Sequence, residues 1–203
     1  MSLKKAFNIT GAAIVVIAAL FAVSCGQNRS KKTAAKDKEA TEVVSETINQ
    51  DKSPKEDTMT YAIISTEKGD MKVELYSNET PGTVANFVKL ANDKFYDGLN
   101  FHRVLPDFVI QGGCPEGTGA GGPGYEIKCE TDAPRQYHDR GVLSMAHRGP
   151  NTGGSQFFIC HNRQGTQHLD GRHTCFGQVV EGLDVIDDIR QGDKILSIRI
   201  VEE

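Results

Sequence analysis

Residues 101–113 read FHRVLPDFVIQGG, and the rest of the domain is organised around this stretch. Pro106 and the glycine pair at the end flank an apolar run that is typical of a short β-strand. Because side chains alternate between the two faces of a strand, Val109 and Gln111 should share a face. Arg103 stands among apolar residues, where a charged group needs a partner or a ligand. The stretch therefore predicts an apolar floor with polar donors beside it.

Two further stretches have the same character. Residues 141–160 read GVLSMAHRGPNTGGSQFFIC and residues 169–177 read LDGRHTCFG, so strand-forming residues again stand beside polar ones. Alternation places Gln156 and Phe158 on one face of a strand and Phe157 and Ile159 on the other. One face is thus expected to bind and the other to pack.

The remaining pattern predicts a mainly β domain. Alternating apolar residues predict further strands, at residues 61–66, 71–76, 179–180 and 195–201. Gly69 is expected at the turn of the first hairpin. Helical spacing predicts two helices, at residues 84–92 and 183–189. Many short strands with two helices predict a closed antiparallel barrel that is capped at both ends.

Together, the three quoted stretches closely resemble the cyclophilin family of peptidyl-prolyl cis-trans isomerases, from about residue 60 to residue 203. The resemblance implies a closed eight-stranded antiparallel barrel capped by two helices, at residues 59–203. It also implies rotation of Xaa-Pro bonds in exported proteins by a non-covalent mechanism in which Arg103 stabilises the twisted amide. The alternative is a catalytically weak module that binds proline peptides as a chaperone. Retention of Arg103, Gln111 and Phe158 favours the enzyme.

The resemblance also implies the residues of the site. The catalytic set would be Arg103, Gln111, Phe108 and Phe158. The substrate-binding set would be Val109, Gly119, Ala146, His147, Arg148, Gln156, His168, Leu169 and His173. Gly119 belongs to a glycine-rich loop without the following lysine and capped helix of a phosphate site, so we interpret this loop as lining a peptide groove.

The sequence departs from the family at three places. Val109 replaces a common methionine, which should change the shape of the apolar socket without removing it. His147 and Arg148 stand where Asn-Ala is frequent, and these bulkier groups should alter substrate preference. His168 stands where many eukaryotic members carry the tryptophan that hydrogen-bonds cyclosporin, so we expect weak cyclosporin inhibition with catalysis retained.

Other classes of function lack support in the sequence. The formal net charge of −4 gives no basic face for nucleic acid. No metal site or cofactor is expected, because no pair among the clustered histidines and cysteines has a recognisable ligand spacing. These residues are His147, His161, His168, His173, Cys160 and Cys175. Proline-containing polypeptides are the expected partners, and we expect a monomer.

The first residues predict export and a lipid anchor. Lys4 and Lys5 precede an apolar run of about 15 residues, shorter than the roughly 20 that span a bilayer. The run ends in AVSCG, which resembles the bacterial lipobox with Cys25 as the lipidated residue. We therefore expect a signal peptide at residues 1–24 and a disordered tether at 25–58, which holds the domain at a bacterial membrane outside the cytoplasm. An uncleaved signal anchor is the alternative.

If Cys25 is lipidated, an even number of cysteines remains outside the cytoplasm: Cys114, Cys129, Cys160 and Cys175. They permit three full disulfide pairings, and Cys160 with Cys175 would be neighbours if they lie on adjacent strands. Buried free thiols are the alternative.

Overall fold

The first hairpin shows how the sequence pattern becomes structure in the computed structural model, which describes residues 58–203. Strands β1 (Thr60–Thr66) and β2 (Gly69–Leu75) pair antiparallel, and buried residues alternate along both. Gly69 has a φ of +134° at the turn, a conformation that side chains disfavour. The predicted hairpin and its turn residue are confirmed.

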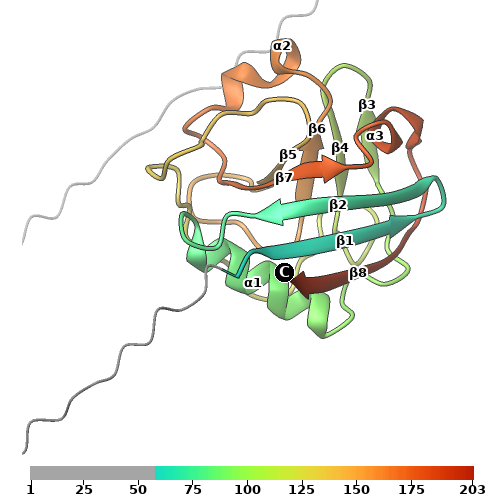
Figure 1. The fold of residues 1–203 in the computed structure, drawn as a ribbon, viewed down its shortest axis with the longest axis horizontal. Coiled ribbons are helices and arrows are strands. Elements are labelled where there is room, and N and C mark those ends of the chain that lie inside the picture. Colours follow the sequence, from blue (N-terminus) through green and yellow to red (C-terminus); the bar gives the residue numbers. More distant parts are fainter. Residues whose placement is uncertain (1–57) are drawn as a thin grey trace, which may run out of the picture. The chain divides into compact units, whose positions relative to one another are not determined.

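The strands form a single antiparallel sheet that is curled but open (Figure 1). The remaining strands are β3 (Arg103–Leu105), β4 (Val109–Gly112), β5 (Val142–Met145), β6 (Phe157–Cys160), β7 (Cys175–Glu181) and β8 (Ile195–Glu202). Their order is β3-β4-β6-β5-β7-β2-β1-β8, which confirms eight antiparallel strands. The predicted closure is wrong, because β3 and β8 are edges. β3 has only three residues, and one isolated bridge, Asn100 to Lys194, links the segments that precede the two edges.

Helix α1 (Pro81–Asn92) begins three residues before its predicted start at residue 84. Pro81 suits the first turn, where a backbone N–H has no helical partner. The cap comes from a distant residue, Glu130. Its carboxylate accepts hydrogen bonds from Gly82 N at 3.0 Å, from Thr83 N at 2.7 Å and from Thr83 Oγ1 at 2.6 Å. Such a cap leaves no signal in the sequence around the helix.

The other helical segments are short. Helix α3 (Val185–Asp188) is shorter than the predicted span 183–189, because Ile189 adopts an extended backbone with ψ of 134°. Helix α2 (Arg163–Thr166) and the 3-10 turn η1 (Gln167–Leu169) were not predicted, since one turn is too short to produce a helical pattern. Asn162 caps α2 by accepting a hydrogen bond from Gly165 N at 2.8 Å.

The main core lies between the curled sheet and α1, which runs beneath β1 and β8 in Figure 1. Four fully buried aromatic rings meet there: Phe87, Tyr96, Phe157 and Phe176. Phe87 and Phe157 are edge-to-face at 5.7 Å, an arrangement that contributes about 0.5–1.5 kcal/mol beyond burial. Val185 and Ile186 of α3 join the same core. Both predicted helices therefore pack an apolar face against the sheet, which fits a capping role.

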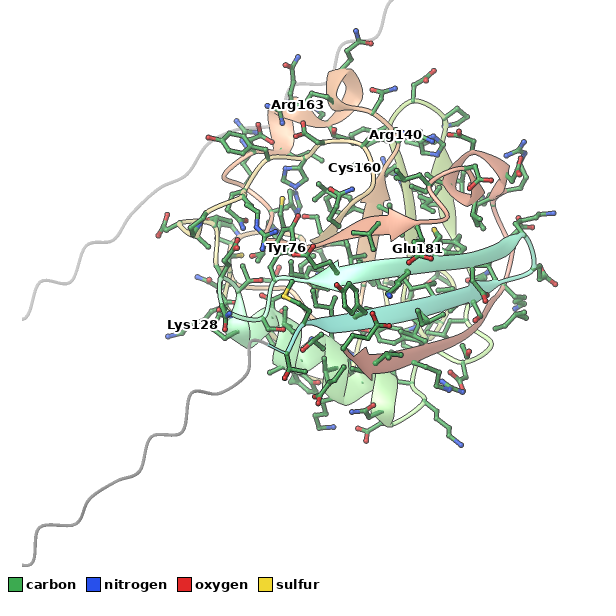
Figure 2. All side chains as sticks on the ribbon, in the orientation of Figure 1. Tyr76, Lys128, Arg140, Cys160, Arg163 and Glu181 are labelled. Atoms are coloured by element: carbon green, nitrogen blue, oxygen red, sulfur yellow. The ribbon has the colours of Figure 1, made fainter. Side chains whose placement is uncertain are left out.

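The cysteines of the described region are free thiols. Cys160 lies on β6 (Figure 2) and Cys175 on β7, with β5 between them. Two strand spacings amount to about 10 Å, whereas a disulfide needs Cα atoms within about 7 Å. The suggested placement of these two residues on adjacent strands is therefore wrong.

The N-terminal predictions fall almost entirely on residues 1–57. The predicted signal peptide, Cys25 and the tether up to residue 57 lie outside the described residues. Within residues 58–203, no helix has the length and apolar character needed to cross a membrane.

Candidate functional site

Two adjoining pockets lie on the face of the sheet formed by β3, β4 and β6. The smaller pocket has a volume of about 170 Å³. All four predicted catalytic residues line it, together with five of the predicted substrate-binding residues. The lining residues are Arg103, Phe108, Val109, Gln111, Ala146, His147, Phe158, Leu169 and His173. The sheet register explains the grouping, because Arg103 lies opposite Gln111 and Gln111 lies opposite Phe158. Three neighbouring strands thus bring these residues into one row.

Apolar side chains form the floor of the smaller pocket. Val109 and Phe158 are 2% and 4% exposed, so the floor is rigidly packed from behind by Val142 and the two buried thiols of β6 and β7. Phe108, Ala146 and Leu169 are partly buried against the same cluster. The structure confirms the predicted alternation on β6: Phe158 faces this pocket, and Phe157 faces the main core.

Arg103 stands at the edge of this floor with its guanidinium exposed. Its Nη1 donates a hydrogen bond to Gln111 Oε1 at 3.3 Å, and its Cζ lies 5.5 Å from the centre of the Phe108 ring. In residues 58–203, no ion pair joins Arg103 to an acidic side chain. The guanidinium is therefore held in place but keeps donors available for a ligand.

A chain of amides orients Gln111. Gln156 Nε2 donates to the carbonyl oxygens of Gly119 and Gly121, both at 2.8 Å. Because carbonyls only accept, this fixes the amide of Gln156 and leaves its Oε1 to accept from Gln111 Nε2 at 3.1 Å. The oxygen of Gln111 is then turned toward Arg103. The glycine-rich loop is thus connected to the arginine through two glutamines.

Two histidines form the opposite wall. The rings of His147 and His173 stack at 4.0 Å, and His173 Nδ1 lies 3.0 Å from the carbonyl oxygen of Met145. Burial lowers the pKa of His173 to about 4, although the Met145 carbonyl opposes the shift. His173 is therefore neutral at pH 7. Within residues 58–203, no group of three or more His, Cys, Asp or Glu side chains is arranged to hold a metal ion.

A third histidine, His138, lies behind the floor in a serine-histidine-aspartate arrangement. Its ring stacks on Phe158 at 5.7 Å, and its nitrogens lie 3.0 Å from Ser144 Oγ and 3.0 Å from Asp170 Oδ1. His138 and Ser144 are fully buried, so no substrate reaches the hydroxyl. Burial also lowers the pKa of His138. The arrangement therefore supports Phe158 from behind.

The larger pocket adjoins the smaller one and has a volume of about 470 Å³. Both pockets are lined by Gln111, Ala146 and His147. The remaining lining comes from residues 119–126 and from Arg148, Thr152 and residues 154–156. The predicted substrate-binding residues Gly119, Arg148 and Gln156 therefore line the larger pocket, which lies beside the apolar one.

The lining also includes residues that the sequence did not suggest. Among them are Tyr125 and Glu126, which directly follow the glycine-rich loop. Their position after that loop is the one signal in the sequence that could have indicated them. Glu126 Oε1 lies 3.7 Å from a guanidinium nitrogen of Arg148, whose side chain is 81% exposed. This charged pair stands at the rim of the larger pocket. His168 lines neither pocket, but its ring stacks on Phe108 at 5.6 Å.

Residues 61–202 match the family model described as cyclophilin type peptidyl-prolyl cis-trans isomerase/CLD. A peptidyl-prolyl cis-trans isomerase of Synechococcus elongatus is 60% identical over 148 residues, which are 71% of this chain and 99% of that protein. Peptidyl-prolyl cis-trans isomerase B of Bacillus subtilis is 58% identical over 130 residues, with 64% and 90% covered. A cyclophilin-type isomerase of Cryptosporidium parvum, solved in the presence of the dipeptide Ala-Pro, superposes with a TM-score of 0.61 at 34% identity, with 70% and 98% covered.

Proposed function

Because this chain belongs to the cyclophilin-type peptidyl-prolyl cis-trans isomerase family, it is a peptidyl-prolyl cis-trans isomerase, and we propose that Arg103 stabilises the twisted imide during rotation. The observation that carries this proposal is the position of Arg103 at the edge of the apolar floor, without an acidic partner in residues 58–203. A proline ring fits such a floor, and the bond before it then lies beside the guanidinium.

The physical task is to lower a rotational barrier without breaking a bond. Amide resonance raises this barrier to roughly 18–20 kcal/mol. As the bond twists, resonance is lost and the nitrogen recovers its lone pair, so a fixed cationic donor interacts more strongly with the twisted imide than with the planar one. Arginine is permanently charged and needs no proton transfer. One well-placed donor of this kind typically contributes about 3–4 kcal/mol to the transition state.

The rest of the smaller pocket holds the proline while the preceding residue turns. Val109, Phe158 and Leu169 bury the ring, and Phe108 lies below the guanidinium. Gln111 belongs to both pockets, so it is placed to orient the peptide between them. The larger pocket then takes residues beside the Xaa-Pro pair.

The test is a protease-coupled assay on a panel of Xaa-Pro tetrapeptides. Arg103→Ala should lower kcat/KM by about 10²–10³-fold, and Arg103→Lys should restore part of it, because lysine keeps the charge but not the planar fork. Arg199→Ala is the matched control, since Arg199 pairs with Asp97 on the surface of β8. If the parent protein shows no isomerase activity, the alternative of a chaperone module that binds proline peptides would be favoured instead.

We also propose that the isomerase works on exported proteins from a lipid anchor at Cys25 in the bacterial cell envelope. The support is the lysine-flanked apolar run and the AVSCG sequence, together with a family match that begins only at residue 61. Acyl chains would hold the protein firmly, because each buried methylene contributes about 0.8 kcal/mol.

Metabolic labelling with radioactive palmitate in a bacterial host tests this anchor. The full chain should incorporate label and sediment with membranes, and Cys25→Ser should lose the label. Cys129→Ser serves as the control, because Cys129 lies in the folded domain. Label that persists in Cys25→Ser would rule out the proposed anchor.

A further inference from the structure

Asn86 of α1 contacts both walls of the larger pocket without lining it. Tyr125 OH lies 2.7 Å from Asn86 Oδ1, and Asn86 Nδ2 donates to the carbonyl oxygen of Gly154 at 2.8 Å. Tyr125 belongs to one wall of the pocket, residues 119–126, and Gly154 belongs to the other. Asn86 itself is only 8% exposed. A single buried amide therefore joins two loops that are far apart in sequence.

The hydrogen-bond partners fix the orientation of this amide. A carbonyl oxygen accepts and never donates, so the nitrogen of Asn86 must face Gly154. The oxygen then faces Tyr125, whose hydroxyl donates to it. Both ends of the side chain are used, and no other residue type of this size offers a donor and an acceptor in the same geometry. Rotation of either wall away from α1 would break one of the two bonds.

The two walls are closely fitted where Asn86 holds them. A Cβ atom at Gly154 would lie 2.9 Å from Pro123 Cδ and 3.4 Å from the carbonyl oxygen of Tyr125. A backbone bond from Ile127 N to Gly153 O at 2.8 Å joins the same segments, but neither residue lines the pocket. Gln156 also joins the two walls, through hydrogen bonds from its Nε2 to the carbonyl oxygens of Gly119 and Gly121, both at 2.8 Å. Gln156 belongs to the lining, whereas Asn86 holds the two walls from outside the pocket.

We propose that Asn86 is a positioning residue that sets the width of the larger pocket, and thereby how tightly the enzyme holds peptide residues beyond the Xaa-Pro pair. This inference rests on the proposed function of the two pockets. An extended peptide rises about 3.3 Å per residue, and the pockets share Gln111, Ala146 and His147. A peptide with its proline in the smaller pocket therefore places a near neighbour in the larger one.

NMR exchange between the cis and trans forms of two peptides tests the inference. The short substrate is acetyl-Ala-Pro-amide, and the long one carries the same Ala-Pro with two further residues on each side. For the long peptide, Asn86→Ala should raise KM about three- to tenfold, which corresponds to about one peptide hydrogen bond lost in the loosened pocket, with kcat within about twofold. The constants for the short peptide should not change. Tyr125→Phe should raise KM for the long peptide by less, because it removes one bond.

Asn92→Ala is the matched control, since it makes the same change at an exposed position of the same helix. It should behave as the parent with both peptides. If Asn86→Ala fails to fold, Tyr125→Phe carries the test, because its ring and the helix remain. An unchanged KM for the long peptide, or an equal loss with both peptides, would overturn the inference alone. A parent that accelerates neither peptide would overturn the proposed function and the inference together.

Discussion

Arg103 of β3 lies directly opposite Gln111 of β4, and its Nη1 donates a hydrogen bond to Gln111 Oε1 at 3.3 Å. Because two carbonyls of the glycine-rich loop orient Gln156, and Gln156 orients Gln111, the position of the guanidinium depends on residues of both pockets. Arg103, the proposed catalytic residue, is thus placed by a polar chain that crosses the site.

This relationship predicts the effect of changing Gln111. Gln111→Ala removes the acceptor that steadies the guanidinium and should lower kcat/KM about tenfold, without a large change in thermal stability. Gln111→Glu should lower it further, since a carboxylate would hold the guanidinium away from the substrate. Gln164→Ala, at an exposed position of α2, is the control. Parental kcat/KM in Gln111→Ala would show that the hydrogen bond does not position Arg103.

A second prediction concerns the distant cap of α1. Glu130→Ala leaves the N–H groups of Gly82 and Thr83 without their acceptor and should lower the free energy of unfolding by about 1–2 kcal/mol. Urea unfolding at pH 7 measures this, with exposed Glu202→Ala as the comparison. A midpoint shift no larger than that of the comparison would mean that water replaces the carboxylate at little cost.

A third prediction follows from the buried histidines. Burial lowers the pKa of His173 to about 4 from a usual 6.5, and it also lowers the pKa of His138 and His161. Between pH 6.5 and pH 4, the unfolded chain binds more protons than the folded chain. The free energy of unfolding should therefore fall as pH drops through this range. Urea midpoints at pH 7.5, 6 and 5 measure the fall, and His173→Gln should reduce it. Equal midpoints at pH 7.5 and 5 would contradict the expectation.

Asp170 extends this acid sensitivity to lower pH. Burial acts to raise its pKa, but hydrogen bonds from Arg163 and His138 outweigh burial and lower the value to about 2. Stability that depends on this carboxylate is present above its usual pKa of 3.8 and is lost as pH falls toward 2. The fall in the free energy of unfolding below pH 4 should therefore be smaller in Asp170→Asn than in the parent.

A fourth prediction concerns cyclosporin. His168 stacks on Phe108 at the edge of the smaller pocket, where the resemblance to cyclophilins implies that many eukaryotic members carry a tryptophan. Without the indole donor, cyclosporin should inhibit isomerase activity only well above nanomolar concentrations, and His168→Trp should strengthen inhibition. Tyr61→Trp, on distant β1, controls for an added indole. Nanomolar inhibition of the parent would be incompatible with this prediction.

Local patterns in the sequence predicted the faces of the strands correctly. Alternation assigned Val109 and Gln111 to the binding face and Phe157 to the core, because the direction of a strand side chain depends only on its position along the strand. The grouping of Arg103 with Phe158 and His173 came instead from the family resemblance. No spacing rule connects residues that meet only after the sheet has curled.

The features that the sequence did not predict all depend on distant contacts. Glu130 caps a helix 47 residues earlier, and Tyr125 reaches Asn86 across 39 residues. The open edge between β3 and β8 was missed because strand count alone does not reveal whether the last pair is too short to close the sheet.

The pairing of β1 with β8 has a consequence for synthesis. The first strand of the sheet receives its outer neighbour only from Ile195–Glu202, which leaves the ribosome after the seven other strands. Until then, a nascent chain carries β1 with one row of backbone groups unpaired, a template for joining another copy. A prematurely terminated product that lacks these eight residues should therefore self-associate through β1.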